Sequence, residues 1–305
     1  MSQKKCLVTG ASGFIGTKLL NLLSSLPYEI CLLSRAEIKG YKTFICDYGV
    51  DPIPNDAFSN IDTIFHLAGY AHDNSDDIEL QHIHKKINYE FTIDLVNLAI
   101  QNNVKNFIFI SSVKAAENRS KKCANEKASN KPSGSYGIAK REAEITLLEL
   151  TQKINMHVSI IRPPLVYGPG VKGNLGNMYM KICNGIFPPL QKTKNIKSMV
   201  HVDDLVRAIV FVSEEKKANN EIYIVTDNKK YSTDQIYKII VTACGKEVPK
   251  WFVPNKLFQL VGFFIPSVRR KVEKLFSNEC YSSKKIQDLG FRSKKSLKDI
   301  NETSF

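Results

Sequence analysis

The stretch "CLVTGASGFIG" (6–16) decides the fold of this chain. It places three glycines, Gly10, Gly13 and Gly16, between a strand-like apolar run and an amphipathic helix-like segment. At this spacing the first glycine makes a tight turn, the second lets a pyrophosphate approach the backbone, and the third lets the helix pack closely on a sheet. The helix N-terminus adds free N–H groups and a positive dipole. The stretch therefore predicts a dinucleotide-binding turn rather than an ordinary glycine-rich turn.

Short apolar runs alternate with helix-like segments through the first half of the chain. The helical patterns cover about 14–26, 76–102 and 135–155. The strand-like runs are "KCLVT", "EICLLS", "KTFIC", "DTIFHLA", "NFIFISS" and "HVSIIRP". Apolar strands separated by helices are typical of a parallel sheet that is buried on both faces. The pattern predicts an α/β fold with a Rossmann-like doubly wound parallel sheet.

The second half reads as a smaller, discontinuous C-terminal substrate lobe. After Tyr167 the alternation gives way to glycine- and proline-rich segments and short helices, and the strand-like "EIYIV" (221–225) is expected to return to the sheet. The polar stretch 114–134 is expected to form a loop over the site. The expected bounds are 1–167 with a return of about 197–225 for the dinucleotide-binding domain, and 168–196 and 226–305 for the lobe.

Composition narrows the class of protein. No window of 18 residues is apolar throughout, so we expect no membrane-spanning helix. A strand-like run begins near Lys4, so we expect no signal peptide. The seven cysteines lack metal-ligand spacing, and several lie in apolar runs. We therefore expect reduced cysteines, no metal and a cytoplasmic protein.

The chain is basic, with a net charge of +13 and a pI of about 9.3. Its basic residues occur as scattered pairs without interleaved aromatic residues, so we expect an anionic small ligand and no nucleic-acid partner. A weak attraction to acidic lipid surfaces is a further alternative. The segment 255–276 is apolar and then basic. We interpret it as a buried lobe helix followed by an exposed one, with contact to a membrane surface as the alternative.

The end of the second strand bears on the choice of dinucleotide. A site for NAD usually carries an acidic residue there to hold the ribose 2′-OH. This strand ends with Ser34 and Arg35 and has no acid before Glu37. An arginine suits a 2′-phosphate, so NADP(H) is favoured and NAD(H) is the alternative. Asp47, just after the third strand, is placed to accept a hydrogen bond from adenine or to form a turn.

The run "YGIAKREAE" (136–144) raises a question about chemistry. It reads as helical from about Ser135, which puts Tyr136 and Lys140 one turn apart on one face. Alone, such a pair is usually an ordinary helix surface. A catalytic role needs a third group and a bound dinucleotide. Ser112, which lies 24 residues earlier at the end of a strand, is the candidate for that third group.

Five motifs together resemble the extended short-chain dehydrogenase/reductase family, which includes nucleotide-sugar epimerases, dehydratases and reductases. They are "TGASGFIG", "HLAG" (66–69), "ISS" (110–112), "YGIAK" (136–140) and "RPPLVYGPG" (162–170), and they span about residues 4–205. The resemblance implies a Rossmann-like domain with a small lobe that binds a nucleoside-diphosphate sugar. It also implies a UDP-sugar partner and a homodimer built on two helices of the cofactor domain.

The resemblance also assigns roles to residues. Ser112, Tyr136 and Lys140 become the catalytic group: Tyr136 exchanges a proton with a substrate oxygen, and Lys140 binds the nicotinamide ribose. Making tyrosinate available near neutrality needs a shift of about three pKa units, or roughly 4 kcal/mol. A cation about 4 Å away supplies that order at an effective dielectric of 20.

The remaining implied positions surround the two ligands. The cofactor set, besides Tyr136 and Lys140, is Gly10, Gly13, Phe14, Ile15, Gly16, Ser34, Arg35, Asp47, Tyr48, Leu67, Ala68, Gly69 and Pro163. The substrate set is Ser112, Tyr136, Asn174 and Lys197. Asn174 would meet the sugar-nucleotide phosphate, and Lys197 would grip the diphosphate where relatives often carry arginine.

The two residues that follow Ser112 bear on the type of reaction. Dehydratases of this family carry an adjacent Asp-Glu pair there, whereas this chain has Val113 and Lys114. Dehydration is therefore excluded. We favour NAD(P)H-dependent reduction of a 4-keto nucleotide sugar, a UDP-4-keto-6-deoxy-hexosamine, in bacterial surface-glycan biosynthesis. The alternatives are a UDP-hexose 4-epimerase with retained NAD and a non-catalytic NADP-sensing protein of the same fold.

Overall fold

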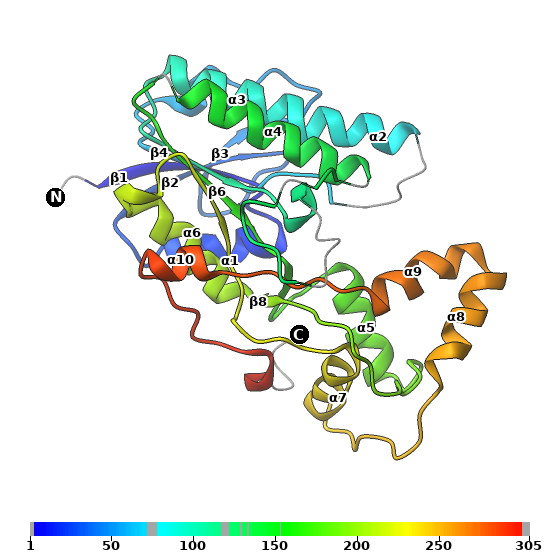
Figure 1. Cartoon of the computed structure of the whole chain (residues 1–305). Coiled ribbons are helices and arrows are strands. Elements are labelled where there is room, and N and C mark those ends of the chain that lie inside the picture. The colour runs from blue at the N-terminus through cyan, green and yellow to red at the C-terminus, as the bar shows by residue number, and fades with distance from the viewer. Residues whose placement is uncertain are drawn as a thin grey trace.

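The computed structural model describes residues 3–71, 78–116, 122–128, 130–132, 134–152 and 154–300. Seven parallel strands form the central sheet in the order β3-β2-β1-β4-β5-β6-β9 (Figure 1). The strands are β1 (Lys4–Thr9), β2 (Tyr28–Ser34), β3 (Lys42–Ile45), β4 (Thr63–His66), β5 (Asn106–Ile110), β6 (His157–Arg162) and β9 (Glu221–Ile224). The expected Rossmann-like doubly wound sheet is confirmed.

The strand order reverses beside β1. This strand pairs in parallel with β2 on one side, Thr9 opposite Leu33, and with β4 on the other, Thr9 opposite His66. We therefore expect the connections after β1 and β4 to leave the carboxyl edge of the sheet in opposite directions. In open parallel sheets this reversal point is where ligands bind.

Helices cover both faces of the sheet (Figure 1). One face packs against α1 (Phe14–Leu23) and α6 (Val202–Glu214), with buried Leu19 and Leu205 in the same apolar cluster. The other packs against α3 (Phe91–Gln101) and α4 (Ser135–Thr151), with Leu95 and Leu147 in a second cluster. The two apolar layers explain why the strands read as continuous apolar runs.

A smaller region with its own apolar cluster lies below the sheet in Figure 1. Its helices are α5 (Gly173–Cys183), α7 (Thr233–Ala243), α8 (Asn255–Phe264) and α9 (Pro266–Phe276), and it adjoins a two-stranded sheet of β7 (Leu165–Tyr167) and β8 (Met199–His201). The short α10 (Lys284–Asp288) then returns to β9. The remaining short helical turns are η1 (Asn55–Phe58), η3 (Val113–Ala116), η4 (Lys216–Ala218) and η5 (Leu297–Asp299).

The long helix expected over about 76–102 is interrupted. Residues 72–77 lie outside the described residues, and the rest divides into α2 (Ile78–His84), a π-helical turn η2 (Lys85–Glu90) and α3. Asn88 in η2 is fully buried, and its amide bonds the backbone N–H and C=O of Tyr70. A wide turn at a buried polar side chain often marks a functional position.

The expectation of reduced cysteines holds for buried Cys6, Cys31 and Cys46 and is wrong for the other four. Disulfides join Cys123 to Cys280 and Cys183 to Cys244. The pairs are 157 and 61 residues apart in sequence, so spacing could not reveal them.

The expectation for 255–276 is also corrected. We interpreted α8 as buried, but Gly262 is its one buried residue. Leu257, Leu260, Phe263 and Phe264 are exposed, because α8 packs chiefly on α9. Across the described parts of the chain, no helix has both the length and the apolar character needed to cross a bilayer.

Candidate active site

The glycine turn is built for close approach of backbone to backbone. A Cβ added to Gly10 would lie 2.6 Å from the Ala68 nitrogen, and one added to Gly16 would lie 2.1 Å from the Gly10 oxygen. Gly10 also has a φ of +71°, which disfavours any other residue. The turn closes with a 3.0 Å bond from the Gly13 N–H to the Gly10 oxygen.

The start of α1 has the features of an anion site. Gly13 is its N-cap, and within the described chain no side chain caps the helix there. Phe14 and Ile15 form its first turn, and their side chains are half-buried. What these two residues offer a ligand is therefore their backbone N–H groups. Unsatisfied N–H groups and the helix dipole favour phosphate at such a terminus.

Three other predicted cofactor residues end β2 and follow β3. The Ser34 side chain is buried, whereas Arg35 and Asp47 are exposed. An exposed arginine at the end of β2 is compatible with a 2′-phosphate and also with an ordinary surface side chain. The preference for NADP(H) over NAD(H) stays a prediction.

Tyr48 supports the glycine turn from outside. Its hydroxyl accepts a 3.2 Å hydrogen bond from the Gly10 N–H and donates a 2.5 Å bond to the Leu33 oxygen. Its ring packs on Phe91 with centroids 4.7 Å apart. Sequence reasoning placed Tyr48 beside the cofactor but missed this bracing of β1 against β2.

His66 ties the end of β4 to its neighbours. Its Nδ1 lies 2.7 Å from the Thr9 hydroxyl and its Nε2 lies 2.9 Å from the Thr92 hydroxyl. Complete burial, with a contribution from nearby Lys140, holds the pKa of His66 well below its usual range. The neutral imidazole is hydrogen-bonded through both ring nitrogens and so holds Thr9 in place. Thr9 in turn accepts hydrogen bonds from the N–H groups of Leu67 and Ala68.

The first turns of α4, which carry Tyr136 and Lys140, pack on the segment around Ser112 at the carboxyl edge of the sheet. Ser112 follows β5, and its hydroxyl accepts a 3.2 Å bond from the Lys114 N–H. A Cβ added to Gly137 would lie 2.5 Å from the Lys114 oxygen, so the first turn of α4 sits directly on the segment after Ser112. Tyr136 precedes this contact, and Lys140 stands one turn later on the same face.

Lys140 is a buried cation with few compensating groups. Its Nζ donates to the Ile110 oxygen at 3.0 Å and lies 4.5 Å from the Phe109 ring centroid. Burial lowers the pKa of Lys140 to about 7, and Glu144 opposes this only in part. The Glu144 carboxylate is already held by Arg162, through bonds of 2.8 and 2.5 Å.

Two further residues complete this edge. A Cβ added to Gly69 would lie 2.7 Å from the Asn88 Oδ1 and 3.2 Å from the Lys140 Nζ, so η2 and α4 meet at that glycine. The Asn88 amide donates to the His84 Nδ1 at 3.1 Å, and the His84 ring lies edge-on to Tyr136 with centroids 5.7 Å apart. We assigned no role to Asn88 or His84 from the sequence; their i, i+4 spacing on a helical segment was the available signal.

Asn174, a predicted substrate residue, belongs to the smaller region. Asn174 is exposed in the first turn of α5. Pro163, predicted to contact the cofactor, is buried after β6, and its carbonyl accepts a 3.2 Å bond from the Val113 N–H. This bond joins the segment after β6 to the one that carries Ser112.

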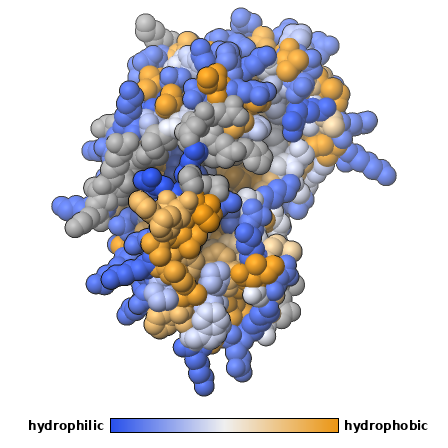
Figure 2. All heavy atoms as spheres, turned by 90° about the vertical axis from the view of Figure 1, so that its right-hand side faces the viewer, coloured by the Kyte–Doolittle hydropathy of each residue, from blue (hydrophilic) through white to orange (hydrophobic). Residues whose placement is uncertain are grey.

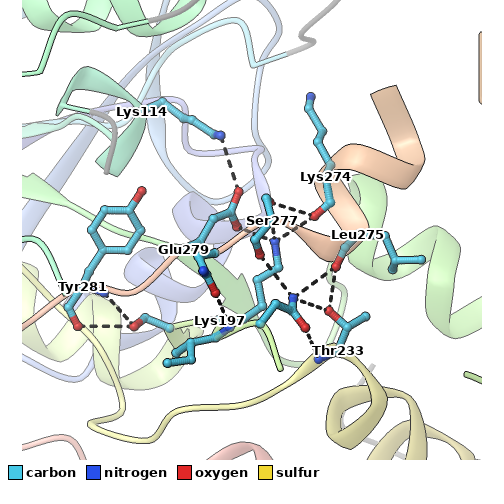
Figure 3. A network of polar contacts seen from close by, with 12 residues as sticks. Lys114, Lys197, Thr233, Lys274, Leu275, Ser277, Glu279 and Tyr281 are labelled. Atoms are coloured by element: carbon cyan, nitrogen blue, oxygen red, sulfur yellow. Dashed lines mark hydrogen bonds and ion pairs between the residues drawn. The ribbon is translucent and has the colours of Figure 1, made fainter. Parts of the chain in front are cut away.

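Lys197 occupies a network of its own (Figure 3). Its buried Nζ donates to the Lys274 oxygen at 2.8 Å and the Ser277 hydroxyl at 3.0 Å, and pairs with Glu279 at 3.2 Å. Lys114 reaches the other Glu279 oxygen at 3.5 Å. Burial lowers the pKa of Lys197, while Glu279 opposes the shift. To bind a diphosphate, the Lys197 ammonium must lose its contact with one of these three oxygen partners.

No described group of three or more His, Cys, Asp or Glu side chains could hold a metal ion.

The model of the NAD dependent epimerase/dehydratase family matches residues 6–226. The chain is 32% identical to the UDP-glucose 4-epimerase of Vibrio cholerae over 262 residues, 82% of this chain and 78% of that protein. It is 27% identical to the N-acetyl-alpha-D-glucosaminyl-diphospho-ditrans,octacis-undecaprenol 4-epimerase of Escherichia coli O157:H7 over 300 residues, 93% of this chain and 89% of that one.

A reductase and a solved structure extend the comparison. The UDP-2-acetamido-2,6-beta-L-arabino-hexul-4-ose reductase of Pseudomonas aeruginosa is 30% identical over 223 residues, 70% of this chain and 51% of the reductase. The structure of the Thermus thermophilus UDP-glucose 4-epimerase with NAD superposes with a TM-score of 0.77 at 19% identity and covers 98% of this chain and 97% of that one. At that identity the superposition shows a shared fold.

Proposed function

The chain belongs to the NAD dependent epimerase/dehydratase family, and from this premise we propose that it interconverts the C4 epimers of a UDP-sugar with a retained nicotinamide dinucleotide. The observation that carries the proposal is the buried Lys140 ammonium, held by Ile110 one turn from Tyr136 and beside the Ser112 segment. Relatives named 4-epimerases also align over more of this chain than the reductase does.

The residues present fit a dinucleotide. Gly10 and Gly16 leave spaces that a Cβ would fill, and the start of α1 offers N–H groups to a pyrophosphate. Tyr48 and His66 brace this turn through Gly10 and Thr9. The dinucleotide would supply the hydride acceptor for the sugar C4 and return the hydride to the opposite face.

The side chains handle the proton at the sugar O4. Tyr136 would take the O4 proton as hydride leaves C4 and give it back when hydride returns. Ser112 would donate a hydrogen bond to the same oxygen, where negative charge develops. Lys140 would favour the phenolate, because a nearby cation lowers the pKa of a phenol. Its own low pKa makes the proton mobile near neutral pH.

On the substrate side, Asn174 and Lys197 remain the proposed contacts for the UDP diphosphate. Asn174 is already exposed at the start of α5. Lys197 would take part only by giving up one acceptor of its network. A cytoplasmic location and a homodimer also remain predictions.

The test is epimerisation without added cofactor. Purified protein should convert UDP-glucose or UDP-N-acetylglucosamine to its C4 epimer, read by anion-exchange chromatography, and denaturation should release a dinucleotide detectable by mass spectrometry. Tyr136→Phe should retain the dinucleotide and lose turnover, while Tyr41→Phe, on the surface beside Ser24, should change neither. Failure of both sugars to convert, with a dinucleotide bound, would contradict the proposal.

A second candidate is reduction of a UDP-4-keto-6-deoxy-hexosamine by NADPH. The observation that favours it is Arg35, which is exposed at the end of β2 where an acid is absent. In this reaction NADPH is consumed in step with product. Stoichiometric loss of absorbance with a 4-keto sugar, and no epimerisation of UDP-sugars, would select the reductase.

A further inference from the structure

The hairpin of α8 and α9 presents an apolar end to solvent. In Figure 1 the two helices project from the side of the smaller region. Phe263 and Phe264, at the end of α8, are 78% and 72% exposed, and Ile265 beside them is also exposed. Further exposed apolar side chains on or just before α8 are Trp251, Phe252, Leu257, Leu260 and Val261. A contiguous set of this kind on a surface marks an interaction site.

The exposure belongs to a folded unit. A Cβ added to Gly262 would lie 3.3 Å from the Arg269 Cα, so the helices touch there. The Phe258 and Phe276 rings pack edge to face, with centroids 5.9 Å apart. The far end of α9 is fixed to the lobe by the bond from Lys197 to the Lys274 oxygen. The hairpin is therefore held with its apolar end outward.

The charged side chains along the hairpin are mostly basic. Residues 255–276 contain five basic side chains and one acidic side chain. The acid, Glu273, pairs with Arg269 at 3.0 Å. Basic side chains follow the phenylalanines within two turns along α9, at Arg269, Arg270 and Lys271. Apolar rings followed by basic groups suit the boundary between acyl chains and anionic headgroups.

We propose that the α8–α9 hairpin docks the protein on an anionic phospholipid surface. Phe263 and Phe264 enter the headgroup boundary, and Arg269, Arg270 and Lys271 contact lipid phosphates. A second copy of the chain is the weaker occupant. In a twofold dimer each patch meets its own copy, so these basic groups would face one another.

The position of the hairpin would set the orientation of the protein on the bilayer. Figure 2 shows the apolar surface of the smaller region next to a hollow in the molecular surface. Docking through that surface brings the hollow close to the bilayer. The proposal stands independently of which sugar is converted and of whether the reaction is epimerisation or reduction.

Co-sedimentation with vesicles tests the proposal. The full chain should pellet with vesicles of equal parts phosphatidylglycerol and phosphatidylcholine, at least tenfold more than with phosphatidylcholine alone. Binding should fall as salt rises, because the basic contacts are screened. Equal binding to both kinds of vesicle, or none, overturns the proposal.

Matched variants separate the two contributions. Phe263→Ser with Phe264→Ser should reduce binding at least tenfold, and replacing Arg269, Arg270 and Lys271 with glutamine should reduce both binding and its salt dependence. The controls are Ile45→Ser with Val50→Ser, exposed apolar residues near β3, and Lys216→Gln with Lys217→Gln. These should bind as the unchanged protein does.

Two further readouts complete the test. Each variant should keep its activity on a water-soluble UDP-sugar and its melting temperature, because the changed side chains lie at the surface. Size-exclusion chromatography must show that Phe263→Ser with Phe264→Ser leaves the oligomeric state unchanged. If these substitutions convert a dimer to a monomer, and the unchanged protein does not bind vesicles, the surface joins two copies of the chain and the proposal is wrong.

Discussion

Two buried lysines, Lys140 and Lys197, show how different surroundings give the same group different uses. Burial lowers the pKa of both. Lys140 has one carbonyl acceptor and an aromatic face among the described residues, whereas Lys197 has two oxygen acceptors and the Glu279 carboxylate. A buried charge without full compensation costs stability and is kept where chemistry needs it. The compensated one holds segments together.

The largest expected effect is on turnover at Lys140. Lys140→Met keeps the length of the side chain and removes the cation, so kcat should fall by about 10³-fold, within the range for lost acid–base function. Lys197→Met should lower kcat by less than about tenfold. Comparable losses in steady-state assays of the two variants would remove the distinction between the lysines.

The second effect is the dependence of stability on pH. Unfolded Lys140 keeps its proton to about pH 10.4, whereas the folded group releases it near pH 7. Between these values the unfolded state binds more protons, so this group's contribution to stability rises with pH, by about 1.4 kcal/mol per unit. In urea unfolding at pH 7 and pH 9, the unchanged protein should gain stability relative to Lys140→Met. A constant difference would show that Lys140 titrates normally.

A smaller effect is expected on folding at Lys197. Lys197→Met leaves Glu279 with Lys114 alone and removes two donated hydrogen bonds, so the free energy of unfolding should fall by about 1–3 kcal/mol. Lys105→Met, which breaks the exposed pair with Asp62, is the control and should cost less than about 1 kcal/mol. If Lys197→Met keeps its stability and instead raises KM for the UDP-sugar, its main role is to bind the diphosphate.

The smallest effect concerns Lys114. Its pair with Glu279 is partly exposed and 3.5 Å long, so Lys114→Met should change stability by less than about 1 kcal/mol. A double-mutant cycle with Glu279→Gln measures the coupling. A coupling above about 2 kcal/mol would show that Glu279 belongs equally to both lysines.

Local patterns predicted the family and much of the fold, while the roles of Ser112, Tyr136 and Lys140 stay predictions. The family resemblance and the parallel sheet are confirmed, because glycine spacing and apolar periodicity act within one strand–helix unit. The partners of Lys197, which are Lys274, Ser277 and Glu279, lie 77 to 82 residues away in sequence. They could not be predicted, since they depend on how α9 returns to the lobe. The π-helical turn at Asn88 was missed for a similar reason: the backbone of Tyr70 is its partner.

The polypeptide crosses repeatedly between the sheet and the smaller region. It leaves after β6, returns through α6 and β9, leaves again through α7 to α9 and comes back at α10, while the Cys123–Cys280 disulfide adds a covalent link. Because several described backbone segments connect the two regions, one of them alone cannot act as a hinge. We therefore expect the two regions to melt in one calorimetric peak, and substrate entry to depend on side-chain and loop adjustments rather than on one region swinging away.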